Sequence, residues 1–327
     1  MKPSGIVGVG RVWRAVLLLG GLLASLVGEE SAPTRRWIPR VAAAPGNPDV
    51  VRLLSFNVLA PCWASPEYYP ASTAPRLDRW VRRQAILDFL KTQAGAVDIF
   101  ALQETTREEF AALAAGLGDQ WLGFQADHRP DYWANWLTPG LPWEPNGVAL
   151  LVRRGRFGNP SFADVPLSDS GNHAAVFSGV LADGRMVRCA SLHLDSDRAA
   201  NRKRELGALL QRLTPRPGHP DFLAGDFNFE TDSGNLKALL RDAGFRNILE
   251  ELGVAQNTHP WDTRYYGADN WGIIDHVLVR KGRHAAGGVV DFGLFERYPN
   301  DEEARINENL ERCGSDHFPI YGTATVR

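Results

Sequence analysis

The sequence predicts an α/β (α+β) fold in which two packed β-sheets are flanked by helices. Short apolar runs of strand length recur along the chain, and loops separate them. A few helical patterns lie between these runs, mostly toward the margins of the strand-rich part. With 327 residues, of which 44% are hydrophobic, the chain can bury the large core that such layered packing requires.

The predicted strands are short and dominated by apolar residues: Arg52–Phe56, Val97–Leu102, Gly147–Arg153, Ala175–Leu181, Met186–Leu194, Phe222–Ala224, Ile273–Val279, Val289–Leu294 and Pro319–Val326. The predicted helices are Arg76–Thr92, Phe110–Leu117, Arg198–Leu213 and Ser233–Ala243. Thr106 and Glu109 have capping-box spacing, which marks the start of the second helix. The first helix has an apolar face that we expect to be buried, formed by Leu77, Trp80, Val81 and Leu87.

Residues 1–30 have the features of an export signal. Basic residues precede an apolar run from Ala15 to Val27, which is short for a membrane span and typical of a secretory signal peptide. Because no small-x-small cleavage site follows, an uncleaved anchor formed by residues 11–28 is the alternative. The protein is therefore expected to be secreted or periplasmic, or to associate with a membrane through this segment.

The rest of the chain divides into a linker and one domain. Residues 31–49 are rich in Pro, Ala and Arg, which predicts a linker. Residues 50–327 hold all the predicted strands, and one catalytic domain, acting as a monomer, is the simplest interpretation.

Charge and cysteine content restrict the function classes. The net charge of -2 and the pI near 6.5 argue against a domain whose main role is non-specific DNA binding. The three cysteines are Cys62, Cys189 and Cys313, and the absence of a Cys-x-x-Cys pair argues against structural zinc. Two alternatives remain for them: a disulfide between Cys62 and Cys313, or three free thiols.

Polar side chains stand at the ends of many predicted strands, where they suggest a metal-assisted hydrolytic site. They are Asn57, Glu104, His193, Asp226 with Asn228, Asp275, and Asp316 with His317. Oxygen ligands suit a magnesium-like ion, and a histidine beside a carboxylate suits in-line attack on phosphorus. Taken singly, Asn57 could simply end a strand, Asp275 could pair with an arginine, and His193 could be a core histidine. Their shared position at strand ends favours a catalytic site.

The strongest single motif is Gly225-Asp226-Phe227-Asn228 after an apolar strand. Together with the other strand-end segments in the same order, it resembles the endonuclease/exonuclease/phosphatase superfamily, from about Val50 to the C-terminus. This resemblance implies a DNase-like, four-layer sandwich of two packed mixed β-sheets flanked by helices. It also implies a metal-dependent phosphoric ester hydrolase that acts by metal- and His-assisted attack of water.

The resemblance implies a role for each site residue. Glu104 would be the principal metal ligand, with Asn57 beside it and Asp316 completing the shell or holding a second ion. The expected ion is Mg²⁺ or Mn²⁺, with Ca²⁺ as an alternative.

The catalytic roles also follow from the resemblance. Asp226 would orient or deprotonate the attacking water, and Asn228 would bind the scissile phosphate. His317, held in its tautomer by Asp275, would stabilise the pentacovalent centre or protonate the leaving oxygen. His193 would be the second imidazole at the phosphate.

Three departures from the family pattern concern the substrate contacts. Leu192 stands where many relatives have Thr, and His276 stands where many have an aromatic residue. No Tyr or Arg matches the mid-chain phosphate contact of some relatives; Asn172 and His173 lie in that region, and Asn172 is taken as the candidate.

Two segments bear on the substrate. The first, Trp121–Trp143, is predicted as an aromatic loop in which Trp133 and Trp136 would stack bases or hold a lipid, or would pack the loop onto the domain. The second, Ser55–Pro61, is similar to the deadenylase-like branch. A nuclease-like phosphodiesterase is therefore favoured, with nucleic acid preferred to lipid. The alternatives are a phospholipid or sphingomyelin phosphodiesterase, an inositol-phosphate phosphatase, and an inactive binding protein of the same fold.

Overall fold

A computed structural model describes residues 49–128, 145–169, 171–229, 235–259 and 272–326. The predicted signal or anchor and nearly all of the predicted linker lie outside these residues, as do Trp133 and Trp136. Among the described helices, none combines the length and apolar character that crossing a bilayer would require.

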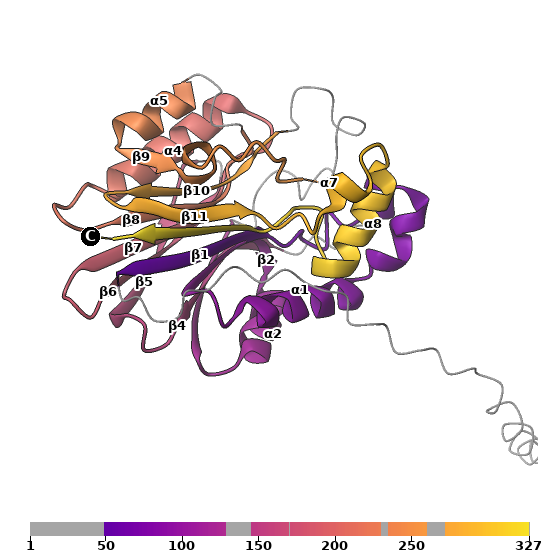
Figure 1. The fold of residues 1–327 in the computed structure, drawn as a ribbon, viewed down its shortest axis with the longest axis horizontal. Helices are drawn as coiled ribbons and strands as arrows, with labels where there is room; N and C mark the ends of the chain where they lie inside the picture. Colours follow the sequence, from indigo (N-terminus) through magenta and orange to yellow (C-terminus); the bar gives the residue numbers. More distant parts are fainter. Residues whose placement is uncertain (1–48, 129–144, 170, 230–234, 260–271, 327) are drawn as a thin grey trace, which may run out of the picture. The chain divides into compact units, whose positions relative to one another are not determined.

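The described strands form two six-stranded mixed sheets (Figure 1). The first sheet has the order β11-β12-β1-β2-β4-β3, with β1 (Val50–Asn57), β2 (Ile99–Thr106), β3 (Trp121–Asp127), β4 (Asn146–Arg153), β11 (Arg283–Val289) and β12 (Ile320–Thr325). The second has the order β5-β6-β7-β8-β10-β9, with β5 (Gly158–Pro166), β6 (His173–Val180), β7 (Met186–His193), β8 (Asp221–Asp226), β9 (Phe245–Asn247) and β10 (Asp275–Arg280). In each sheet one central pair is parallel, β1 with β2 and β7 with β8, and its neighbours are antiparallel.

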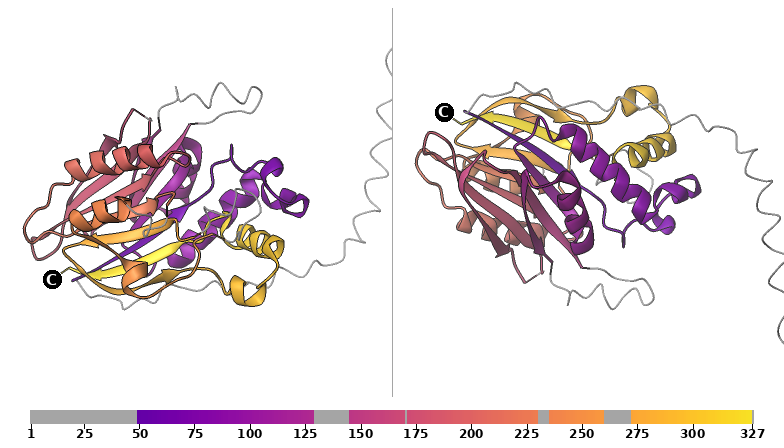
Figure 2. Two further views of the ribbon diagram at one scale, coloured as in Figure 1. Left: turned by 90° about the horizontal axis from the view of Figure 1, so that it is seen from above. Right: turned by 90° about the horizontal axis from the view of Figure 1, so that it is seen from below.

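Helices cover the outer face of each sheet. On the first sheet these are α1 (Arg79–Gln93) and α2 (Arg107–Leu117), and on the second α4 (Ala199–Arg212) and α5 (Asn235–Asp242) (Figures 1 and 2). The remaining described elements are the longer helix α8 (Glu302–Cys313) and the short elements η1 (Pro66–Tyr68), η2 (Ala71–Arg76), α6 (Ile248–Glu251) and α7 (Leu294–Arg297). The predicted four-layer sandwich of two packed mixed sheets flanked by helices is confirmed.

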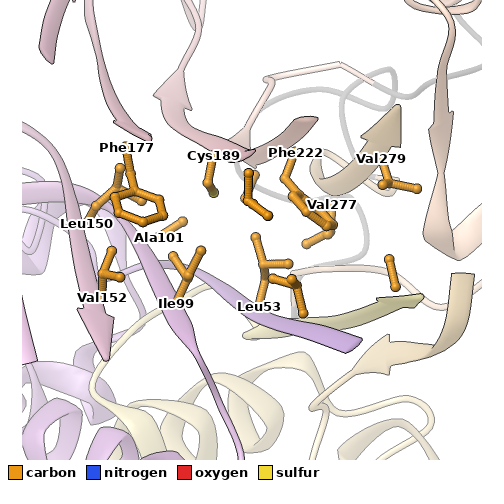
Figure 3. Close-up of a cluster of buried hydrophobic side chains, with 14 of the residues drawn as sticks. Leu53, Ile99, Ala101, Leu150, Val152, Phe177, Cys189, Phe222, Val277 and Val279 are labelled. Carbon is orange, nitrogen blue, oxygen red and sulfur yellow. The ribbon is translucent and has the colours of Figure 1, made fainter. Parts of the chain in front are cut away.

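The main core lies between the two sheets. In Figure 3, Leu53 and Ile99 of the first sheet face Phe177, Cys189 and Val277 of the second. Every other residue of the strands points inward, as the two-residue period of a strand requires. Burial of each such aliphatic or aromatic side chain contributes about 1.5–3 kcal/mol.

Helix α1 buries a face that differs in part from the one predicted. Asp78 caps the helix by accepting from the backbone N–H groups of Trp80 and Val81. The helical period then places a buried stripe through Arg82, Ile86, Phe89, Leu90 and Gln93. Of the predicted face, Leu77 is buried and Leu87 packs against the core, whereas Trp80 is 63% exposed and Val81 49% exposed, so the prediction was right for the first two residues and wrong for the other two.

Other differences arise at turns. The predicted strand Val289–Leu294 was placed too late in the chain: the observed strand β11 ends at Val289. After it, the Asp291 side chain accepts from the Gly293 N–H and makes a turn. Trp121–Asp127 forms edge strand β3 rather than a loop, and Phe124 stacks on Phe162 with ring centroids 5.4 Å apart. The predicted helix start at Thr106 is confirmed, because its hydroxyl accepts from the Glu109 N–H as an N-cap does.

The cysteines are free in the structure. Cys62 lies near Asn146 Nδ2, at 3.9 Å, whereas Cys313 is buried against the carbonyl oxygen of Asn309. Of the two alternatives, a disulfide or three free thiols, the structure has three free thiols.

Candidate active site

The polar residues that were predicted at strand ends lie together at one end of the sandwich. Strands β1, β2, β7 and β8 end there, and β10 and β12 begin there because they run antiparallel to β8 and β1. In the second sheet, Asp226 pairs in register with His193 on one side and Asp275 on the other. The topology alone therefore places three predicted site residues in one row.

The carboxylate oxygen Oδ2 of Asp226 is the point on which the site converges. It lies 3.1 Å from Asn57 Nδ2, 3.6 Å from His193 Nε2 and 3.8 Å from His317 Nε2. Asp226 is buried. Burial and the nearby Asp275 carboxylate raise the pKa of Asp226, and the two imidazoles oppose the rise. A carboxylate in these surroundings can hold a water molecule and accept a proton from it.

Glu104 reaches the site through an irregularity in β2. The pairing of β2 with β4 shifts between Gln103 and Thr105, and Glu104 itself has φ +58°. A left-handed conformation in a non-glycine residue is strained and persists only where the surroundings enforce it. Here Glu104 Oε1 accepts from Asn57 Nδ2 at 2.8 Å and Oε2 accepts from the Ala60 N–H at 2.8 Å.

Asn57 faces the carboxylates with its amide nitrogen. Its side-chain oxygen accepts from the Leu59 N–H at 3.0 Å, which sets the orientation of the amide. The NH₂ group then donates to both Glu104 and Asp226. The amide oxygen keeps a second lone pair beside its bond from Leu59, so the expected role of Asn57 as a metal ligand stays a prediction.

His317 is oriented by Asp275. Its Nδ1 lies 2.9 Å from Asp275 Oδ2, so Nδ1 carries the hydrogen and Nε2 faces Asp226. Burial lowers the pKa of His317, but the charge of Asp275 and the bond to it outweigh burial and raise that pKa well above its usual value. These surroundings therefore favour the protonated imidazole.

Thr258, which the sequence analysis did not single out, fixes this pair. Its hydroxyl accepts from the N–H groups of Ile274 and Asp275, each at 3.2 Å, and its carbonyl accepts from the Phe318 N–H at 2.8 Å. One residue thus joins the segments that carry Asp275 and His317.

Asp316 lies beside two further residues that the sequence analysis missed. Tyr69 donates its hydroxyl to Asp316 Oδ2 at 2.8 Å, and the ring of His259 packs on His317 with centroids 4.6 Å apart. Asp316 Oδ1 is buried without a hydrogen-bond partner. Burial raises the pKa of Asp316. Neither Tyr69 nor His259 follows a predicted strand, so strand-end reasoning could not find them.

The Gly225–Asn228 turn holds Asp226 in place. A Cβ atom on Gly225 would lie 1.9 Å from the Leu192 carbonyl oxygen, so only glycine allows β7 and β8 to approach this closely. Asn228 has φ +52°, its N–H donates to Asp226 Oδ1 and its side-chain NH₂ donates to the Leu194 carbonyl. The predicted contact of Asn228 with a phosphate stays a prediction.

His276, which replaces the family's aromatic residue, supports the same turn. Its Nε2 lies 2.9 Å from the Phe229 carbonyl, and its Nδ1 lies 3.1 Å from Asn247 Nδ2. The ring also packs edge-on against Phe227. Burial lowers the pKa of His276 to about 4, so the ring is neutral and donates through Nε2.

The substrate-binding predictions have mixed outcomes. Asn172 donates to Glu205 Oε1 at 2.9 Å, and its role at the substrate stays a prediction. Trp133 and Trp136 lie outside the described residues. Of the arginines in α1, Arg82 is 1% exposed and donates to the carbonyls of Val58, Leu59 and Gly314.

The donor set fits a divalent cation. Three groups of titratable side chains within the described residues bring one ligand atom each to within 4.8 Å of one another: Glu104–His193–Asp226, His259–Asp316–His317 and Asp226–Asp275–His317. Hard carboxylate oxygens outnumber imidazole nitrogens in the first and third of these groups, and in the second the buried, unpartnered Oδ1 of Asp316 is the kind of atom that a cation would satisfy. The arrangement can thus hold a metal ion, orient a water molecule and supply a proton.

Comparison with known proteins agrees with this arrangement. Residues 54–317 match the model of the Endonuclease/Exonuclease/phosphatase family. No curated protein sequence matches the chain significantly.

Solved structures share the fold at low sequence identity. The human Nocturnin catalytic domain is 18% identical, with a TM-score of 0.58, 84% of this chain covered and 94% of that chain. ANGEL2, a 2′,3′-cyclic phosphatase, in complex with adenosine-2′,3′-vanadate is 14% identical, with a TM-score of 0.60 and coverage of 84% and 95%. A mannosyl-6-phosphatase from Bacteroides thetaiotaomicron VPI-5482 is 16% identical, with a TM-score of 0.55 and coverage of 83% and 98%. The chain belongs to the endonuclease/exonuclease/phosphatase family and is a phosphoester hydrolase.

Proposed function

We propose that this protein is a magnesium-dependent phosphodiesterase that hydrolyses single-stranded nucleic acid. The observation that carries the proposal is the position of Asp226 Oδ2, within 4 Å of both His193 Nε2 and His317 Nε2 and bridged to Glu104 through Asn57. A carboxylate between two imidazoles and beside a second carboxylate suits attack of water on a phosphate.

Glu104 would hold the ion, together with Asp316 through its buried Oδ1. Mg²⁺, or Mn²⁺ in its place, would neutralise charge on the phosphate oxygens. Asn57 would act as a donor that keeps Glu104 and Asp226 in place.

The remaining roles concern water, phosphate and leaving group. Asp226 would orient the water and accept its proton as the water oxygen attacks phosphorus. His193 and Asn228 would bind the non-bridging oxygens. His317 would donate its Nε2 proton to the leaving oxygen, while Asp275 keeps the imidazolium oriented.

Two considerations favour nucleic acid over lipid. The segment Ser55–Pro61 resembles the deadenylase-like branch of the family. In addition, ANGEL2, whose fold this chain shares, was solved with a nucleoside-derived vanadate. Sugar phosphates, phosphoinositides and sphingomyelin are the alternatives.

We also propose that residues 1–30 export the protein or anchor it to a membrane, and that it acts as a monomer. Fractionation of cells that express the full chain tests the first of these proposals, and its mass in solution tests the second.

The substrate proposal is tested by assaying the chain with Mg²⁺ on single-stranded and double-stranded oligonucleotides, sphingomyelin, phosphoinositides and sugar phosphates. Single-stranded oligonucleotide should be cleaved fastest, and EDTA should abolish cleavage. Preference for a lipid or a sugar phosphate would contradict the nucleic-acid proposal. Binding without turnover of any ester would favour an inactive binding protein.

A further inference from the structure

His128 lies next to the proposed site but has no part in it so far. It directly follows β3, and its ring centroid is 6.1 Å from that of His193. Its Nδ1 accepts a hydrogen bond from the backbone N–H of His173 at 3.2 Å. The ring is therefore fixed at the edge of the sandwich where the substrate phosphate would bind.

This contact determines the tautomer of His128. Since Nδ1 is an acceptor, the hydrogen of the neutral ring is on Nε2. Burial, together with the neighbouring His193 and His173, lowers the pKa of His128 to about 3, so the ring is neutral at physiological pH. Its Nε2 is buried and has no hydrogen-bond partner in the structure.

A buried donor without an acceptor is rare in folded proteins and destabilises them, unless a ligand or water accepts from it. His173, which anchors the His128 ring, is itself held in place: its Nδ1 lies 2.6 Å from Asp164 Oδ1, where β5 pairs with β6. The protein thus holds an unsatisfied N–H rigidly beside His193.

We propose that His128 Nε2–H binds an oxygen of the substrate unit that adjoins the scissile phosphate. A neutral donor suits an oxygen acceptor, either a sugar oxygen of the neighbouring nucleotide or an oxygen of the next phosphate. His128 would then determine which esters are good substrates, without taking part in the chemical step. The inference rests on the proposed phosphodiesterase function.

Two substitutions separate the donor from its anchor. His128→Asn keeps an acceptor near the position of Nδ1, for the His173 N–H, but has no donor at the position of Nε2. His128→Gln places an amide NH₂ near the position of Nε2. His219→Asn is the matched control. His219 Nδ1 also accepts from a backbone N–H, that of Met186 at 3.0 Å, but at the opposite end of strands β7 and β8.

The substrates form a graded series with Mg²⁺ present. Bis(p-nitrophenyl) phosphate has no neighbouring nucleotide, a dinucleoside monophosphate adds sugars, and a short oligonucleotide adds flanking phosphates. His128→Asn should lower kcat/KM about tenfold for the substrates that have the contacted oxygen and leave bis(p-nitrophenyl) phosphate unchanged. A loss already present with the dinucleoside identifies a sugar oxygen, and a loss only with the oligonucleotide identifies a phosphate oxygen.

His128→Gln should recover part of the activity that His128→Asn loses, and His219→Asn should lose no activity. Equal losses on all three substrates, or no loss on any, would overturn the inference while the phosphodiesterase activity of the wild-type chain stands. A wild-type chain that cleaves none of the three diesters would overturn the proposed function, and the inference with it.

Discussion

His317 Nδ1 lies 2.9 Å from Asp275 Oδ2, and this contact raises the pKa of the imidazole and directs its Nε2 at Asp226. Replacing Asp275 by Asn removes the charge that raises the pKa of His317, while burial continues to lower it. Because the proton donor would then lose its proton at lower pH, the alkaline limb of the kcat–pH profile should move toward acid. At the alkaline end kcat should fall about 10²- to 10⁴-fold.

The matched control for Asp275→Asn is Glu251→Gln. Glu251 lies 3.3 Å from His284, so it is also paired with an imidazole, but at the far edge of the sandwich. Its profile should match the wild type. An unchanged alkaline limb in Asp275→Asn would contradict the role given to this pair.

Glu104 should set the requirement for metal. Glu104→Gln keeps the shape of the side chain but removes a negative charge from the oxygen set. We expect the Mg²⁺ concentration for half-maximal activity to rise about 10- to 100-fold. The rise in Tm that Mg²⁺ gives the wild-type chain should also shrink, which reports binding independently of turnover. A Mg²⁺ titration identical to that of the wild type would exclude Glu104 as a ligand.

Arg82 joins two segments of the site, since it donates to the carbonyls of Val58 and Leu59 after β1 and of Gly314 before Asp316. Arg82→Met leaves these buried carbonyls without a donor, and we expect a loss of about 2–4 kcal/mol in the free energy of unfolding. Urea denaturation measures it. Arg83→Met, which breaks a pair with the half-exposed Glu108 side chain, is the control and should shift the midpoint much less.

The buried neutral imidazole of His276 should make the fold sensitive to acid. Burial lowers the pKa of His276 from 6.5 to about 4, so between these values the unfolded chain binds a proton that the folded chain does not. The free energy of unfolding should therefore fall as pH falls through this window, by up to about 1.4 kcal/mol per pH unit for this group.

His276→Gln tests the acid prediction. The amide has no proton to gain but can still donate near the Phe229 carbonyl. The variant should lose stability less steeply than the wild type between pH 6.5 and 4. Parallel curves for the two proteins would assign the acid sensitivity to other groups, such as His128.

The sequence predicted those parts of the site that follow regular strands. Asn57, His193 and Asp226 end strands, and Glu104 lies at the irregularity near the end of β2, so the apolar runs before them mark these positions directly. Two sheets with a central parallel pair each then bring the ends to one edge. Neither a ligand nor a contact needed to be known for that step.

The parts that were missed depend on contacts between irregular segments distant in sequence. Tyr69 reaches Asp316 across 247 positions, and no local pattern marks such a contact. The orientation of Asn57 depends on one turn contact with Leu59. The aromatic pattern that suggested a binding loop partly marks β3, where Phe124 packs on Phe162.

The central claim is that Asp226 and His317 carry out metal-dependent hydrolysis of a phosphodiester. The most direct measurement compares wild type, Asp226→Ala and His317→Ala in cleavage of a single-stranded oligonucleotide with Mg²⁺, with urea denaturation of each variant as the test of folding. We predict that both variants remain folded and lose nearly all activity, and that EDTA abolishes cleavage by the wild type. Near-normal turnover in either folded variant, or cleavage that persists in EDTA, would contradict the account.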